Sequence, residues 1–115
     1  MRRPLHLVAV AALLSAGCFS EKPAPAEPIA KTASVEAASQ GTVFSPATVT
    51  IEQGGSVTWT FGTFTHNVTF LATPGAPTNV PTTRNGTATR TFAAPGTFAY
   101  ACTIHPGMIG SVIVK

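Results

Sequence analysis

The chain has 115 residues, of which 44% are hydrophobic and only 10% are charged, and its formal net charge is +3. So few charges exclude a charge-rich disordered chain, and the lack of a basic run beyond the first three residues excludes a nucleic-acid-binding protein. Ten glycines without a three-residue period exclude collagen, two cysteines exclude a dense disulfide scaffold, and the length suits one domain.

Residues 1–17 have the layout of a secretory signal. Two arginines precede an apolar run, Leu5–Leu14, that is too short to span a bilayer as a stable helix and has no polar face. Small residues and then Cys18 follow, which resembles a bacterial lipoprotein processing site, where the cysteine is lipidated and becomes the new N-terminus. Ordinary cleavage near Gly17 would instead leave Cys18 free. We expect an exported protein of the bacterial periplasm or cell envelope, whose membrane contact is a lipid anchor on Cys18.

Residues 18–40 are rich in Pro, Ala, Glu and Ser and poor in large apolar residues. This composition predicts a semi-extended linker, which would hold a domain at 41–115 away from its attachment point. A domain of about 75 residues buries only about 60% of its unfolded surface, so a bound metal would be a useful staple.

The segment 41–115 alternates apolar and polar residues and lacks the 3.6-residue period of a helix. Gly, Pro and Asn turn signals separate the alternating runs. Short strands at such regular spacing predict an all-β fold, as an antiparallel sandwich or barrel. Strands are expected at 47–51, 56–61, 66–70, 87–92, 97–102 and 109–114, and 72–86 is expected to be mainly loop.

Four residues of this segment carry metal-binding side chains: His66, Cys102, His105 and Met108. A thiolate, two imidazoles and a thioether are the donor set of an electron-transfer copper site. Taken singly, a cysteine or a methionine is more often a buried apolar residue. Taken together, in an exported chain where an unpaired thiol is a liability, they predict a metal site. A Cys18–Cys102 disulfide is the alternative that the cysteine count leaves open.

The segment Tyr100–Met108 resembles the copper loop of the cupredoxins, the plastocyanin-like family, in the short Cys-x-x-His-x-x-Met form of the amicyanins. His66-Asn67-Val68 resembles the first histidine motif of the family, and 44–59 and 92–98 resemble its strands. The resemblance implies a Greek-key β-sandwich, here in a short variant, with one type 1 copper ion at one end. It implies His66, Cys102 and His105 as the trigonal ligands and Met108 as the axial ligand.

The resemblance also implies a one-electron carrier that cycles Cu(II) and Cu(I). Electrons would pass through His105, near the surface, to transient redox partners of a monomeric protein. The apolar patch around it would include Phe64, Pro106, Gly107 and Pro74. Asn67 would hydrogen-bond toward Thr103 and hold the two ligand loops together.

Three other functions compete with this one. A copper-delivery or copper-storage protein would use the same ligands. An enzyme would need an open coordination position or a second metal, and both histidines of the domain are already used, so we expect no enzyme. A metal-free adhesion module would make the donor cluster a coincidence. The domain has one acid, Glu52, against Arg84, Arg90 and Lys115, so partner binding should depend little on salt.

Overall fold

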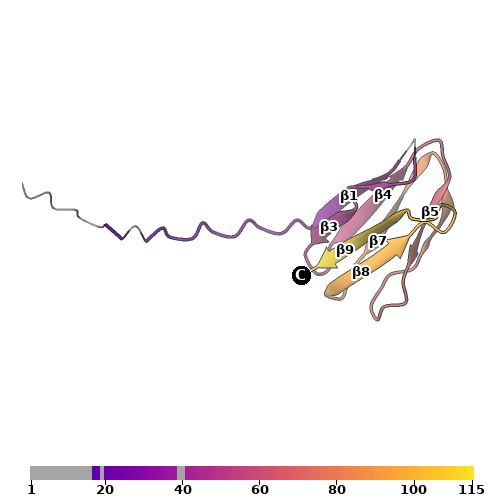
Figure 1. Cartoon of the computed structure of the whole chain (residues 1–115). Coiled ribbons are helices and arrows are strands. Elements are labelled where there is room, and N and C mark those ends of the chain that lie inside the picture. Colours follow the sequence, from indigo (N-terminus) through magenta and orange to yellow (C-terminus); the bar gives the residue numbers. More distant parts are fainter. Residues whose placement is uncertain (1–16, 19, 39–40) are drawn as a thin grey trace, which may run out of the picture.

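The computed structural model describes residues 17–18, 20–38 and 41–115 (Figure 1). Apart from Gly17, the signal peptide expected at 1–17 lies outside the described residues. The described part contains nine strands and no helix, which confirms the all-β prediction. These described ranges contain no helix that is long and apolar enough to cross a bilayer.

The strands form two sheets that pack as a sandwich. One sheet has the order β2-β1-β4-β7, and the other has the order β3-β9-β8-β5-β6. Most neighbouring strands are antiparallel, but β1 pairs with β4, and β3 with β9, in parallel. The sequence predicted an antiparallel sandwich or barrel; the sandwich is confirmed, but these two strand pairs are parallel. The bounds are β1 Thr32–Ala37, β2 Phe44–Ser45, β3 Thr48–Ile51, β4 Ser56–Phe61, β5 His66–Phe70, β6 Val80–Thr83, β7 Gly86–Thr91, β8 Gly96–Ala101 and β9 Ile109–Val114.

The linker expected over 18–40 is shorter than predicted, because Thr32–Ala37 forms β1. This strand runs beside β4 in continuous register, and its Val35 and Ala37 side chains are buried in the core. This strand was not predicted because only two of its positions face inward and the segment has few large apolar residues. Its apolar pattern is too weak to distinguish a strand from a linker. The domain therefore begins near residue 31, and the residues from 20 to 31 form an extended tether (Figure 1).

A second difference lies in the expected loop 72–86, where Val80–Thr83 forms β6 along the edge of β5. Val80 is buried, whereas Pro81 interrupts the strand pattern, as proline does on edge strands. The guanidinium of Arg90 donates to the carbonyl oxygens of Thr78 and Asn79, both at 2.8 Å, and so secures the loop before β6. The other expected strands lie within one residue of their predicted bounds.

Aromatic side chains fill the space between the sheets. Trp59 of β4 packs edge-on against Tyr100 of β8 at a centroid distance of 5.4 Å and against Phe70 of β5 at 6.0 Å. Such rings supply much of the apolar burial of a small domain. They also lock β4 against β5 and β8, and the candidate ligand His66 begins β5 while Cys102 directly follows β8.

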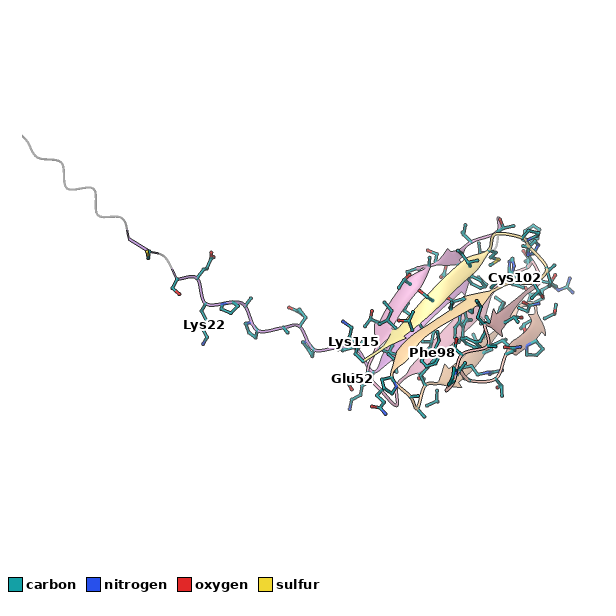
Figure 2. All side chains as sticks on the ribbon, turned by 60° about the horizontal axis from the view of Figure 1, so that its bottom comes forward. Lys22, Glu52, Phe98, Cys102 and Lys115 are labelled. Carbon is teal, nitrogen blue, oxygen red and sulfur yellow. The ribbon has the colours of Figure 1, made fainter. Side chains whose placement is uncertain are left out.

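The two ends of the sandwich differ in character. Figure 2 shows Cys102 at one end and Glu52 and Lys115 at the other, where the tether joins. Backbone hydrogen bonds fix that junction, since Glu52 N–H donates to Ala30 O and Ser56 N–H donates to Lys31 O. We call these the Cys102 end and the tether end. The tether therefore leaves the Cys102 end uncovered.

Candidate metal centre

The four candidate ligands come from two places in the chain that meet at the Cys102 end. His66 is the first residue of β5, whereas Cys102 directly follows β8 and Met108 directly precedes β9. His105 lies in the loop between those two strands. The pairing of β5 with β8 brings the two places together although 36 residues separate His66 from Cys102.

Three donor atoms of this group face one another. His66 Nδ1 lies 3.1 Å from His105 Nδ1, and Cys102 Sγ lies 3.9 Å from the former and 3.6 Å from the latter. Ligands held at about 2.0–2.3 Å from one metal ion lie about 3–4 Å from each other. The triangle therefore has the size that a single ion requires.

His66 is oriented by a residue of the N-terminal segment. Its Nε2 atom lies 3.0 Å from the carbonyl oxygen of Ala38, just after β1. A carbonyl only accepts, so Nε2 carries the proton and Nδ1 presents its lone pair to the centre. This contact could not be predicted from the sequence, because a backbone carbonyl is common to all residue types and Ala38 lies in the expected linker.

The loop between β8 and β9 is closed by its own backbone. Cys102 N–H donates to Met108 O at 2.9 Å, and Met108 N–H donates to His105 O at 3.2 Å. Gly107 has a φ of +83°, a left-handed conformation that favours glycine. That turn returns the chain to Cys102, and Met108 is buried there with none of its surface exposed.

Asn67 links the two ligand segments, as the family resemblance implied. Thr103 N–H donates to Asn67 Oδ1 at 2.9 Å, and Asn67 Nδ2–H donates to Thr103 Oγ1 at 2.7 Å. A further bond comes from the Thr69 hydroxyl to Asn67 Oδ1 at 3.3 Å. Since Asn67 and Thr103 each adjoin a candidate ligand, the paired bonds fix the separation of His66 and Cys102.

Burial differs sharply among the candidate ligands. His66 and Met108 are fully buried and Cys102 is 3% exposed, whereas His105 is half-buried. Phe64 and Ile104 are 52% and 43% exposed. The only candidate ligand with appreciable access to solvent is therefore His105.

One expected member of the patch around His105 lies elsewhere. Gly75, the neighbour of Pro74, packs against Ala94 and Phe98, and Ala94 lies in the turn before β8, at the tether end of that strand. The prediction for Pro74 was wrong because β5 carries the chain away from His66 before the loop begins. Phe64, Pro106 and Gly107 are exposed in the loops beside the candidate ligands, as expected.

The chemistry of the donor set fits copper. Soft sulfur donors together with imidazole suit both copper oxidation states. Cys18 and Cys102 are both free thiols, so the alternative disulfide is not formed. Among the described residues, His66, Cys102 and His105 have ligand atoms within 4.8 Å of one another.

Comparison with known proteins also indicates a copper-binding protein. The family model for copper binding proteins of the plastocyanin/azurin family matches residues 31–115, and the chain therefore belongs to this family of cupredoxins. The predicted fold class and the copper cofactor are thereby confirmed. The start of the match also agrees with a domain that includes β1.

Individual relatives are similar over the same region. The chain is 43% identical to amicyanin-alpha of Methylorubrum extorquens over 76 residues, which are 63% of this chain and 64% of that protein. It is 39% identical over 88 residues to a chloroplastic plastocyanin of Tetradesmus obliquus, over 64% and 59% of the two chains. It thus spans less than two thirds of either relative. A purple cupredoxin from Nitrosopumilus maritimus superposes with a TM-score of 0.62 at 26% identity, over 72% and 99% of the chains.

Proposed function

We propose that this protein is an exported one-electron carrier with a type 1, or blue, copper centre. Bound copper would supply a Cu(II)/Cu(I) couple. The observation that carries the proposal is the triangle of His66 Nδ1, Cys102 Sγ and His105 Nδ1, with donor separations of 3.1–3.9 Å. A site already assembled by the fold needs little rearrangement when the charge at its centre changes, and this favours fast electron exchange.

We assign His66, Cys102 and His105 as the three strong ligands and Met108 as the weak axial one. The bonds of His66 to Ala38 O and of Asn67 to Thr103 hold the strong donors in place. Met108 is placed by the backbone hydrogen bonds that close the loop. A thioether held in this way suits a weak ligand that tunes the potential.

Electron exchange would take place through His105, since the other three candidate ligands are covered. The exposed Phe64 and Ile104 and the neighbouring Pro106 give this end an apolar character. Small interfaces of that kind suit transient redox partners of a monomeric carrier. A copper-delivery or storage role is less well supported, because a donor protein must expose its metal and three of the four ligands here are buried. An enzymatic role would need a further ligand set or an open position.

The N-terminal segment would serve export and attachment. Cys18 is exposed and precedes the tether in the sequence, and the tether joins the domain at the end opposite Cys102. A lipid on Cys18 would therefore hold the protein at a membrane without covering the metal centre. Mass spectrometry of the mature N-terminus tests this part, since an acylated Cys18 is expected and a chain beginning after Cys18 would exclude the anchor.

Copper loading followed by visible and paramagnetic resonance spectroscopy tests the proposal. An intense thiolate-to-copper band with a narrow hyperfine splitting is expected. Cys102→Ser should abolish the band, whereas Met108→Leu should keep it and raise the reduction potential. A colourless protein with ordinary tetragonal copper, or one that binds no copper, would overturn the proposal. Ready loss of copper to an acceptor on reduction would favour delivery instead.

A further inference from the structure

The outer face of the five-stranded sheet carries an apolar groove that the metal centre does not use. Its volume is about 400 Å³. The groove runs across the middle strands of that sheet, and its lining residues are Ala47, Thr48, Leu71, Ala99, Tyr100, Ile109, Gly110 and Ser111.

The alternation of β8 and β9 explains the hollow shape. Phe98 and Tyr100 face the core, so Ala99 between them faces outward, with only a methyl group to fill its place. Two large exposed side chains flank Ala99: Leu71 is 55% exposed and Ile109 is 66% exposed. Large aliphatic groups that flank a hollow in this way mark a binding surface more often than an isolated exposed residue does.

This face is uncharged. None of the groove residues is charged, and the outward positions of β3, β8 and β9 are Thr48, Thr50, Thr97, Ala99, Ala101, Ile109, Ser111 and Ile113. The charged side chains of the domain lie elsewhere: Lys31, Glu52 and Lys115 at the tether end, Glu36 and Arg90 on the other sheet, and Arg84 in the turn after β6. A charged group entering the groove would lose water and gain no partner of opposite sign.

The groove is continuous with the metal-binding loop. Ile109, which forms one wall, directly follows Met108 in the chain. Across the sheet, Ile109 pairs with Ala101, which directly precedes Cys102. Whatever occupies the groove therefore lies beside the two strand ends that carry these candidate ligands.

We propose that the groove is a docking site for a redox partner protein that inserts one large apolar side chain from an uncharged part of its surface. This inference rests on the proposed electron-carrier function and extends its docking face from His105 onto the sheet. An anchor residue in a pocket, surrounded by neutral contacts, is the usual way in which a small interface gains affinity. A second copy of this chain fits less well, because two copies of this face would set hollow against hollow.

The test uses the full mature chain loaded with copper and reduced, labelled with ¹⁵N, and titrated with N-acetyl-tryptophanamide as an uncharged apolar probe. Backbone shifts are expected to centre on Leu71, Ala99, Ile109 and Ser111. Between about 20 and about 500 mM NaCl the affinity should not fall, because no charges take part. N-acetyl-lysinamide should produce no shifts at these positions.

Two groove variants and one control variant test whether the probe binds in the groove. Ala99→Ile, which fills the groove with a strand-forming side chain, and Ile109→Ser, which removes a wall, should each weaken binding of the probe about fivefold or more. Val43→Ser is the matched control, since Val43 is 58% exposed and does not line the groove. It should leave the affinity within about twofold, the usual effect of a surface change away from a contact.

The visible spectrum of the oxidised form and the rate of oxidation by ferricyanide are recorded on the same samples. A normal copper band without groove shifts would overturn the docking proposal and leave the carrier function standing. Absence of the copper band would instead count against the function. Concentration-dependent shifts at the groove without any probe would identify a second copy as the occupant and would also overturn the proposal.

Discussion

The Nε2 atom of His66 lies 3.0 Å from the carbonyl oxygen of Ala38, a residue 28 positions earlier in the chain. Ala38 follows β1, which is held to the sheet by parallel pairing with β4. The orientation of a buried candidate ligand therefore depends on a segment whose composition is that of a linker.

Truncation tests this dependence. A chain that begins at Gly41 loses β1, the buried Val35 and the Ala38 acceptor, whereas a chain that begins at Pro28 keeps all three. Loss of one buried valine and several sheet hydrogen bonds should lower the free energy of unfolding by at least about 3 kcal/mol. Urea denaturation of the copper-free proteins measures this difference. Equal midpoints for the two chains would show that β1 is dispensable.

Asn67 provides a second prediction. Asn67→Leu removes both hydrogen bonds to Thr103 and should cost about 1–2 kcal/mol, because partly buried polar groups lose their partners. The loops should also release copper faster to a competing chelator. Asn67→Asp keeps an acceptor for Thr103 N–H, and the Thr103 hydroxyl can turn to donate, so this variant should hold its copper longer than the leucine variant. Identical release rates for the two variants would exclude a bridging role.

Most of the candidate ligands could be predicted from the sequence, but fewer of the strands and contacts that hold them in place could be. The ligand loop is contiguous, and its spacing is read directly from Cys102, His105 and Met108. Strong alternation likewise marked β4, β8 and β9. β1 and β6 were missed because each has a weak apolar pattern: β1 has two buried positions, and in β6 only Val80 is buried. The contact of His66 with Ala38 could not be predicted either, because any residue type can offer a backbone carbonyl oxygen.

The Tyr100 hydroxyl gives a pH-dependent prediction. Tyr100 is 1% exposed, and its hydroxyl has no hydrogen-bond partner within the part of the chain that the structure describes. Burial raises the pKa of Tyr100 above its ordinary value of 10.0, and the nearby Trp59 indole, which lies outside hydrogen-bonding geometry, lowers it by less. The folded protein thus keeps this proton at a pH where the unfolded chain loses it. The resulting stability is present below pH 10 and is lost as the pH rises through the raised pKa.

Tyr100→Phe should therefore change stability little at pH 7, by less than about 1 kcal/mol, because no hydrogen bond is lost. Above pH 10 the wild-type protein should lose stability faster than the variant, by up to about 1.4 kcal/mol per pH unit. Denaturant titrations of both proteins across this range give the difference directly. Parallel pH profiles would mean that Tyr100 titrates alike in the folded and unfolded states.

Gly110 faces the same tyrosine ring from β9, and Tyr100 and Gly110 are directly paired across the two strands. A Cβ at Gly110 would overlap the ring and hydroxyl of Tyr100, and the ring is itself enclosed by Phe44 and Trp59. Gly110→Ala should therefore cost about 1–3 kcal/mol through overpacking, although alanine is otherwise the better strand residue. Denaturant unfolding measures the cost.

The matched control is Gly86→Ala at the start of β7, where an added Cβ meets no atom closer than 3.9 Å. It should be neutral or slightly stabilising. In a Tyr100→Val background the ring is gone, so Gly110→Ala should there cost much less than in the wild-type protein. A coupling of about 1 kcal/mol or more between the two positions is expected from the double-mutant cycle. Strict additivity would show that the glycine is required for some reason other than the ring that lies over it.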